Sequence, residues 1–515
     1  MRKYLFSAVF VSGLTSLALE MAASRLLEQT FGMSNLVWAC IIGLILIYLA
    51  GGYFLGGYWA DRSPSYRTFF QILIWAALAI ALIPLVSKPV LRSASDAFDQ
   101  LQIGMLAGAF VSVLVLLIVP VTLLGTASPF AIRLAIQQTD SAGKISGKIY
   151  AISTLGSFIG TFLPVLFLIP TIGIYRTFLV LSAILLVSAL IGLWRTVGIR
   201  ITLAYIWTPI LLGLIWWIGL AGPEKDTAGM IYETESSYNY LQVLESNQYR
   251  VLRMNEGQGM HSVYHPTIMD YYGPWEMVLV APYFNAYPYP PENVKSMAIV
   301  GLAAGTTARQ ATYVYGPIPI DGFEIDQKVV DIGRKYFDMN EPNLNVIVQD
   351  GRWGLEHSTK KYQVISVDAY RPPYIPWHLT TREFFQIVRQ HLTHDGVMVI
   401  NVGRAPDDRR LVEALASTIL SVFPSVHVVD VPGTFNTIIY ATVQSTVDEN
   451  LKRNYDYLVS RGNLPALLLE TAKTAVASLQ PAPAPGPVFT DDLDPVEWIT
   501  NDMILRFIFS GEKLQ

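Results

Sequence analysis

Four acidic side chains lie where short apolar segments in the second half of the chain end. Glu324 and Asp326 come at the end of one such segment, Asp350 at the end of the next, and Asp368 at the end of the one after. In open α/β sheets, ligands bind at the edge where the carboxyl ends of parallel strands meet. A carboxylate there accepts hydrogen bonds from ribose hydroxyl groups, although a single acid more often caps a helix. Four acids at successive strand ends therefore predict a nucleoside site.

The preceding apolar segment, 296–301, leads into a loop of small residues, Gly301-Leu302-Ala303-Ala304-Gly305-Thr306. Small side chains let the backbone approach a ligand closely, and a tight turn has the same composition. The sequence contains neither G-x-G-x-x-G nor a P-loop lysine, so a pyrophosphate cradle is not predicted. The only cysteine, Cys40, lies in an apolar run, so no disulfide and no cysteine-based metal site is predicted.

The elements that must position these residues alternate between strands and helices, which is typical of a doubly wound parallel sheet. The pattern predicts strands at 296–301, 318–324, 344–348, 363–368 and 397–401, and helices at 304–315, 327–338 and 380–391. A hairpin of 238–245 and 248–254, joined by Ser246-Asn247, precedes the sheet, and a second hairpin of 425–431 and 435–443 follows it. The tail is predicted to be helical, with a stiff proline-rich spacer at 481–487.

The first half of the chain has a different composition. The whole sequence is 52% hydrophobic and 15% charged, with a mean hydropathy of +0.39. A bilayer-spanning helix needs about 20 apolar residues, and about seven segments qualify: 4–27, 35–58, 68–87, 105–127, 149–171, 177–194 and 201–221. We therefore expect a polytopic α-helical membrane bundle fused to a Rossmann-like α/β domain. The predicted domains are a transmembrane domain at 1–221, a β-hairpin lid at 229–295, a nucleoside-binding domain at 296–445 and a helical tail at 446–515.

Charge separates the same two halves. Residues 1–221 hold 13 basic and 6 acidic residues, whereas the remainder holds 23 basic and 34 acidic residues, which disfavours nucleic acid as a partner. With the N-terminus inside, nine loop Lys and Arg residues lie inside and four outside, as the positive-inside rule requires. Seven spans then place residues 222–515 outside, whereas a cytosolic nucleoside requires them inside. We expect the cytosol, with one span re-entrant or 128–138 inserted as an extra one; a truly extracytoplasmic domain is the alternative.

Two ionisable residues lie in the first apolar segment. Glu20 and Arg25 are costly at membrane depth, so such groups usually pair or serve a pathway. One interpretation is a substrate or proton site, which would make the bundle a transporter or exporter with a nucleoside-sensing soluble domain. The other is a Glu20–Arg25 pair that orients the helix near the membrane interface.

The segment 229–445 resembles the spermidine synthase (polyamine aminopropyltransferase) family, a branch of the class I S-adenosylmethionine-dependent fold. The residues that carry the resemblance are Ser236–Val243, Gly301–Arg309, Phe323-Glu324-Ile325-Asp326 with Lys335-Tyr336-Phe337, Asp350-Gly351-Arg352, Asp368, and Glu383-Phe384-Phe385 before Leu392–Gly396. The whole chain is similar to bacterial proteins that fuse such a domain to a membrane bundle, which implies a bacterial inner membrane as its location.

The resemblance implies a site for S-adenosylmethionine or its decarboxylated form as co-substrate, with methylthioadenosine as a bound product. Glu324 would hold the ribose, Asp350 the adenine amino group, and Asp368 would take a proton from an attacking amine. The residues implied to bind the donor are Gln242, Gly301, Gly305, Glu324, Asp326, Asp350 and Gly351. Methyl transfer and a binding-only domain are the alternatives to aminopropyl transfer.

The acceptor side departs from the family pattern. The family carries acids at the positions of Ala304 and Arg371 and a tyrosine at that of Pro274. A guanidinium suits a carboxylate or another anionic group, so the acceptor is expected to be a small-molecule amine or an anionic or lipid-soluble compound; a homodimer is left open. The candidate acceptor-site residues are Tyr264, Tyr271, Tyr272, Arg371, Asp491 and Asp492.

The acidic segment Thr490–Glu497 has two interpretations. A tail that folds back would return a carboxylate of Asp491 or Asp492 to the acceptor pocket, or pair it with Arg371. Alternatively, Thr490 or one of the aspartates caps the predicted helix 496–509, with Pro495 in its first turn.

Overall fold

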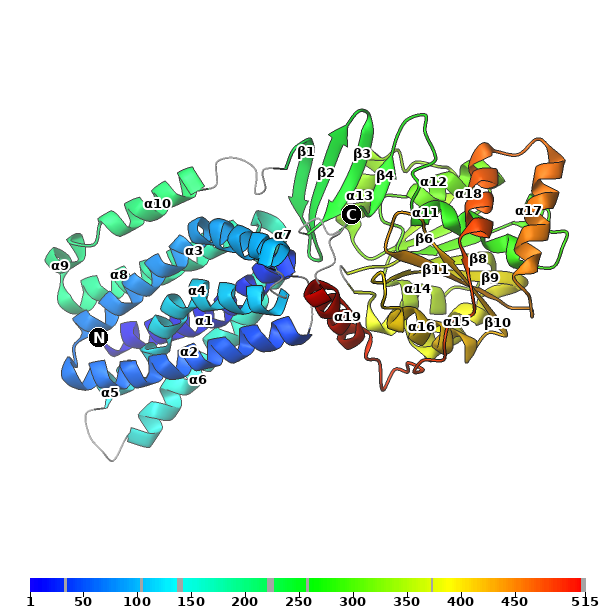
Figure 1. The fold of residues 1–515 in the computed structure, drawn as a ribbon. Coiled ribbons are helices and arrows are strands. Elements are labelled where there is room, and N and C mark those ends of the chain that lie inside the picture. The colour runs from blue at the N-terminus through cyan, green and yellow to red at the C-terminus, as the bar shows by residue number, and fades with distance from the viewer. Residues whose placement is uncertain are drawn as a thin grey trace. The chain divides into compact units, whose positions relative to one another are not determined.

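The computed structural model describes residues 1–31, 35–101, 105–136, 142–219, 227–255, 259–371 and 374–510 (Figure 1). The chain forms two compact units. The first consists of Met1–Asp226 with Glu235–Tyr240, and the second of Thr227–Thr234 with Leu241–Gln515.

The first unit is α-helical. Its helices are α1 (Arg2–Phe31), α2 (Asn35–Arg62), α3 (Tyr66–Leu101), α4 (Met105–Gly125), α5 (Ala127–Ala135), α6 (Ala142–Leu163), α7 (Ile169–Ile172), α8 (Ile174–Val197), α9 (Ile199–Leu203) and α10 (Trp207–Gly219). Within the residues that the structure describes, seven segments are long and apolar enough to cross a membrane. They agree with the seven segments expected from the sequence.

Small residues let the helices of this unit approach one another closely. A Cβ atom added at Gly156 of α6 would lie 2.1 Å from the carbonyl oxygen of Phe10 in α1, so a larger side chain does not fit there. The stretch suggested as an extra insertion, 128–138, lies mostly in α5, which has nine residues. That length is too short to span a bilayer of about 30 Å at 1.5 Å per residue.

The second unit is built on an eight-stranded sheet with the order β12-β10-β11-β9-β8-β5-β6-β7. The strands are β5 (Met297–Val300), β6 (Ile320–Glu324), β7 (Leu344–Val348), β8 (Tyr362–Val367), β9 (Leu392–Gly403), β10 (Ser425–Asp430), β11 (Asn436–Thr442) and β12 (Leu479–Gln480). Strands β5 to β9 pair in parallel, whereas β9, β11, β10 and β12 pair antiparallel. The predicted α/β fold class is therefore confirmed.

Two apolar layers cover the sheet. Met297 and Ile299 of β5 belong to one layer, and Ala298 and Val300 to the other, which explains why β5 is apolar throughout. The first layer includes α12 (Thr306–Tyr315), α17 (Glu449–Arg461) and α18 (Ala466–Ala477). The second includes α14 (Gly351–Glu356), α15 (Arg382–Gln390), α16 (Arg410–Leu420) and α19 (Val496–Ser510). Figure 1 shows the strands between these helices.

A four-stranded sheet, β1 (Met230–Glu235), β2 (Tyr240–Ser246), β3 (Tyr249–Met254) and β4 (Ser262–Tyr264), precedes the large sheet. The predicted hairpin is β2–β3, but its two-residue turn is Asn247-Gln248, one residue later than expected. Both turn residues have positive φ, 50° and 68°, as a hairpin turn matching the strand twist requires. Leu241 and Leu252 pack with Ala304 and with Val329 of α13 (Gln327–Tyr336), so this sheet contacts the glycine loop.

The tail returns along the second unit. Gly486 donates a backbone hydrogen bond to Ser417 of α16, Phe489 is fully buried, and Val496 and Ile499 join the apolar layer. The proline-rich stretch therefore leads the chain across α16 to α19.

Candidate functional site

The carboxyl ends of β5 and β8 meet at Gly301. Gly301 has φ +87°, and a Cβ atom there would lie 2.5 Å from the carbonyl oxygen of Asp368. Only glycine tolerates both that backbone conformation and that contact. The loop of small residues predicted to approach a ligand thus also brings the end of β5 against the end of β8.

Glu324 ends β6 and faces the same loop. One carboxylate oxygen accepts a hydrogen bond from the amide of Ala303, at 2.9 Å, and the other accepts one from the amide of Asp326, at 3.0 Å. Ala303 has a positive φ of 49°, which is uncommon for a residue other than glycine. Burial raises the pKa of Glu324 to about 7. The side chain is therefore oriented in advance, and each oxygen keeps a second lone pair for a ligand hydroxyl.

Asp326 has a structural role. It is 2% exposed and accepts a hydrogen bond from the amide of Lys328 at 3.0 Å, which caps α13. For this acid the structure shows the capping arrangement, and a ligand-binding role stays a prediction.

Asp350 follows β7, and both of its carboxylate oxygens accept hydrogen bonds. One oxygen accepts a hydrogen bond from the amide of Trp353, capping α14, and the other lies 2.9 Å from Nε2 of His378. The hydrogen bond from His378 lowers the pKa of Asp350 below its usual value. A Cβ atom at Gly351 would lie 2.4 Å from Val300, so this residue packs against β5.

Asp368 follows β8 directly. Its carboxylate accepts a hydrogen bond from Nδ2 of Asn401 in β9 at 3.0 Å, and burial raises its pKa to about 6. The hydroxyl of Tyr370 bridges the carbonyl of Asn401 and the amide of Gly403, each at 3.0 Å, which holds the end of β9. Asp368 is thus a part-buried carboxylate that is able to accept a proton near neutral pH.

The three predicted acceptor-site tyrosines have different surroundings. The Tyr264 ring lies under the guanidinium groups of Arg309, at 4.3 Å, and Arg250, at 5.8 Å. The hydroxyl of Tyr271 accepts a hydrogen bond from the amide of His265. Tyr272 is 83% exposed, so its side chain faces solvent.

Gln242, predicted to bind the donor, lies in β2. It is 3% exposed and bonds to Thr227, with its Nε2 3.0 Å from the threonine hydroxyl. Its role toward a donor stays a prediction. Gly305, which begins α12, has a φ of +87°, and a Cβ there would meet Met339 at 2.5 Å.

Pairing with Arg371 was one of the alternatives for the tail, and Asp491 does not make it. Asp491 forms a two-pronged ion pair with Arg352 of α14, at 2.8 and 2.7 Å. Arg371 is exposed and pairs through its backbone with Tyr374. The reason is geometric, because Arg352 is the second residue of α14, where the returning tail passes. Asp492 is exposed on the tail.

Helix capping at the tail is done by Asp494. It accepts a hydrogen bond from the amide of Val496 at 2.9 Å and another from the hydroxyl of Thr380 at 2.5 Å. Burial raises the pKa of Asp494 to about 6. Thr490, the other proposed cap, instead bonds to the amide of Leu493.

The helical unit corrects a second expectation. Arg25 pairs with Glu28, one helical turn on, at 2.9 Å, and not with Glu20. Arg25 also donates to the carbonyl groups of Ser236 and Tyr238, which belong to the same unit. The spacing of three residues suits an ion pair on one helix face, whereas five does not.

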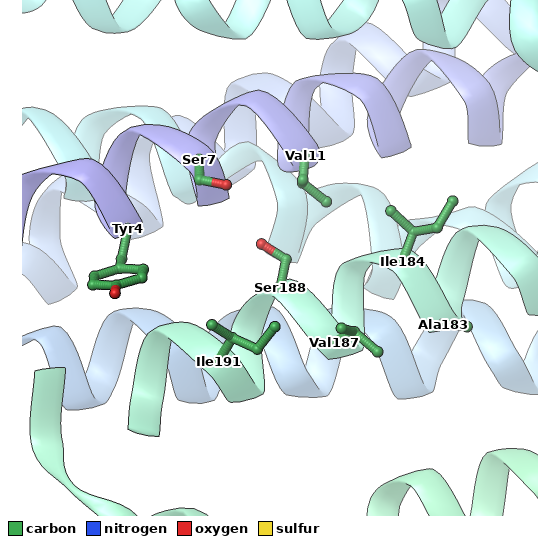
Figure 2. A pocket seen from close by; sticks show the side chains of 8 residues that line it. All are labelled: Tyr4, Ser7, Val11, Ala183, Ile184, Val187, Ser188 and Ile191. Atoms are coloured by element: carbon green, nitrogen blue, oxygen red, sulfur yellow. The ribbon is translucent and has the colours of Figure 1, made fainter. Parts of the chain in front are cut away.

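A hollow of about 490 Å³ lies between α1 and α8 (Figure 2). Its lining is uncharged: Tyr4, Ser7, Val11, Ala183, Ile184, Val187, Ser188 and Ile191. Neither Glu20 nor Arg25 lines it, so this hollow does not support the predicted polar pathway.

Sequence reasoning missed His378, Asn401 and the role of Arg352. Each acts on a strand-end acid or on the tail from a distant position in the chain. Arg352 follows Asp350-Gly351 and was visible as part of that motif, whereas no local pattern singled out His378 or Asn401.

Residues 278–454 match the spermine/spermidine synthase domain family. A probable polyamine aminopropyl transferase of Bifidobacterium longum is 40% identical over 219 residues, which are 41% of this chain and 47% of that protein. A polyamine aminopropyltransferase of Vibrio vulnificus is 31% identical over 184 residues, 33% of this chain and 58% of that protein. The chain spans about half the length of the curated relatives that it matches.

Among solved structures, a probable spermidine synthase from Corynebacterium glutamicum covers 52% of this chain and 98% of its own, with a TM-score of 0.40 and 19% identity. A spermidine synthase from Thermotoga maritima covers 47% and 87%, with a TM-score of 0.36 and 20% identity. The strand order of the large sheet defines a doubly wound α/β domain. The match to the spermine/spermidine synthase domain family lies in the second half of the chain, and it confirms the resemblance seen in the sequence.

Proposed function

We propose that this protein is a membrane-bound transferase of the spermidine synthase type. Its donor is an adenosyl sulfonium, S-adenosylmethionine or the decarboxylated form. The observation that carries the proposal is the set of carboxylates Glu324, Asp350 and Asp368 at the ends of β6, β7 and β8, around the glycine loop that follows β5. The names of the polyamine aminopropyltransferase relatives support aminopropyl transfer as the reaction.

The nucleoside half of the reaction uses the β6 and β7 ends. Glu324 accepts hydrogen bonds from the two ribose hydroxyl groups with its remaining lone pairs, and Asp350 accepts one from the adenine amino group. Because both carboxylates are already held by backbone amides, binding needs little reorganisation.

The transfer step uses Asp368. The nitrogen of an amine attacks the propyl carbon next to sulfur, the C–S bond breaks, and its electron pair stays on sulfur, which becomes a neutral thioether in methylthioadenosine. The amine must lose its proton to attack, and an ionised Asp368, with a pKa of about 6, accepts it at neutral pH. The sulfonium is a good leaving group, so catalysis consists mainly of aligning nucleophile and carbon.

The acceptor is a small-molecule amine, and the charges around the predicted acceptor residues favour one that also carries an anionic group. Tyr264 lies beside the guanidinium groups of Arg309 and of Arg250, the latter paired with Glu245, and Arg371 is exposed just after Asp368. Cations disfavour a second ammonium group on the acceptor and favour a carboxylate.

Calorimetry with methylthioadenosine and the full chain in detergent tests the nucleoside half. Glu324→Ala should abolish binding, whereas Glu292→Ala, a surface acid paired with Arg461, should bind like the wild type. Equal affinity of wild type and Glu324→Ala would overturn the assignment.

The nucleoside product distinguishes the reaction types. Release of methylthioadenosine means that the propyl side of the sulfonium was cut, and release of adenosylhomocysteine means that the methyl group moved. Chromatography after incubation with each donor and an amine separates the two. Formation of neither product would favour a binding-only domain.

We propose further that the second unit faces the cytosol, where the donor is made. Protease treatment of sealed inside-out vesicles should then cleave within residues 450–510, and protection of that region would place the unit on the other side.

A further inference from the structure

The C-terminal tail contacts the loop before α15. Oδ1 of Asp491 accepts a hydrogen bond from the hydroxyl of Thr381, at 2.7 Å, and the amide of Asp491 donates to Glu383, at 3.0 Å. Three residues on, Asp494 accepts a hydrogen bond from Thr380. Thr380, Thr381 and Glu383 thus each form a hydrogen bond with the tail.

The same tail carboxylate holds Arg352. Its two oxygens accept parallel hydrogen bonds from both Nη atoms of Arg352, 139 residues earlier in the chain. This planar, two-pronged pairing restricts the direction of the guanidinium more than a single contact does. The side chain of Arg352 is 19% exposed and that of Asp491 40%, so the pair is partly shielded from solvent.

Arg352 also contacts a residue that binds Asp350, the acid assigned to the nucleoside. Its Nη1 also donates to the carbonyl oxygen of His378, at 3.1 Å, and the ring of His378 donates from Nε2 to Asp350, at 2.9 Å. The contacts therefore run from Asp491 through Arg352 and His378 to Asp350.

The tail does not need Asp491 for attachment. Phe489 is fully buried, its carbonyl accepts a hydrogen bond from Arg382 at 2.9 Å, and Val496 and Ile499 lie in the apolar layer. Arg410 adds an ion pair to Asp502 at 2.7 Å. These contacts attach the tail to the second unit without the Asp491–Arg352 pair. The pair is therefore able to serve another role.

We propose that the tail is part of the nucleoside site: Asp491, through Arg352, keeps His378 on one oxygen of Asp350 and so aims that carboxylate at the 6-amino group of a purine. This inference rests on the proposed function. A carboxylate accepts a hydrogen bond from a 6-amino group and repels a 6-oxo group, so Asp491, Arg352 and His378 are positioning residues for base specificity.

The test compares two nucleosides that differ only at that position, 5′-methylthioadenosine and 5′-methylthioinosine, by calorimetry on the full chain in detergent. The wild type should prefer the amino compound by at least about 100-fold. Asp491→Asn should lower that preference about tenfold, because a charged pair becomes a neutral one. The matched control is Asp456→Asn, which removes an exposed carboxylate of α17 and should leave the preference unchanged.

Two further variants separate positioning from structure. His378→Ala should lose the preference, and His378→Gln, which keeps an N–H donor, should restore part of it. Asp491→Asn and Arg352→Gln should not add in the double variant, because they remove the same pair.

The inference is overturned if Asp491→Asn leaves the preference intact. It is also overturned if the variant weakens both nucleosides equally while lowering the thermal midpoint, which is the behaviour of a structural strap. A wild type that binds neither nucleoside would instead contradict the proposed function, so the two failures are distinguishable.

Discussion

At the carboxyl ends of the parallel strands, the carboxylates after β6 and β7 are held differently from the carboxylate after β8. On the β6 and β7 side, Glu324 accepts two backbone hydrogen bonds, and Asp350 accepts one backbone bond and one from His378. On the β8 side, the structure gives Asp368 a side-chain donor, Asn401. The first side is organised before any ligand arrives, whereas the second keeps a carboxylate with capacity to accept a proton. A rigid donor side and a less constrained acceptor side fit a transferase that binds one constant nucleoside.

The largest effect should come from Asp368→Asn. An amide cannot accept the proton, so turnover should fall about 1,000-fold, as expected for loss of a general base. The affinity for methylthioadenosine should stay within about twofold, because Asp368 is assigned to the acceptor side of the comparison. Single-turnover release of the nucleoside and calorimetry measure the two quantities. If Asp368→Asn also lost its affinity for methylthioadenosine, the assignment of Asp368 to the acceptor side would be contradicted.

The pH dependence of stability tests the donor side. Burial raises the pKa of Glu324 from its usual 4.5 to about 7 in the folded protein. The folded state thus binds the proton more tightly than the unfolded state. The contribution of Glu324 to the free energy of unfolding is therefore fully present below pH 4.5 and is lost as pH rises through about 7. The loss is roughly 3 kcal/mol at most.

The measurement is the thermal midpoint of the full chain from pH 4.5 to 8. Glu324→Gln should flatten the part of the profile that Glu324 contributes, whereas Asp331→Asn, which changes an exposed acid of α13, should keep it. An unchanged profile in Glu324→Gln would contradict the assigned burial.

The junction of the two sides is Gly301. Gly301→Ala should destabilise the protein by roughly 2 kcal/mol, because a Cβ atom meets the Asp368 carbonyl in a left-handed conformation. Gly316→Ala is the matched control, since Gly316 has a φ of +78° with nothing within 4 Å of an added Cβ. The thermal midpoints of the two variants are compared. Gly316→Ala reports the cost of the positive φ alone, and the additional loss in Gly301→Ala reports the cost of the close contact. Equal shifts would show that the close approach costs nothing.

The smallest effect should come from Arg461→Gln. Arg461 pairs with Glu292 at 2.7 and 2.6 Å, the same two-pronged geometry as Arg352–Asp491. Its side chains are more exposed, at 33% and 59% against 19% and 40%. Water screens such a pair, so neither the thermal midpoint nor nucleoside affinity should change measurably. A clear change of either quantity in Arg461→Gln would show that any two-pronged ion pair has such an effect. The position of the Arg352–Asp491 pair beside Asp350 would then not be the cause of its effect on nucleoside binding.

Local pattern determined much of this protein. The lengths of the apolar runs indicated the seven candidate spans, and the alternation of apolar segments and helical patterns indicated strands β5 to β11. The acids at the strand ends were also recognisable, because a strand end is marked by neighbouring residues. These features depend on interactions within a few residues, so a single sequence contains them.

Tertiary structure decided the partners. Asp491 pairs with Arg352 and not with Arg371, Arg25 pairs with Glu28 and not with Glu20, and His378 lies on Asp350. A charge in the sequence has many possible partners, and only the packing of α14, α15 and the returning tail brings one of them within 3 Å of Asp491. Ion pairs and hydrogen bonds fall off within a few ångströms, so residue types alone could propose these contacts but not choose among them.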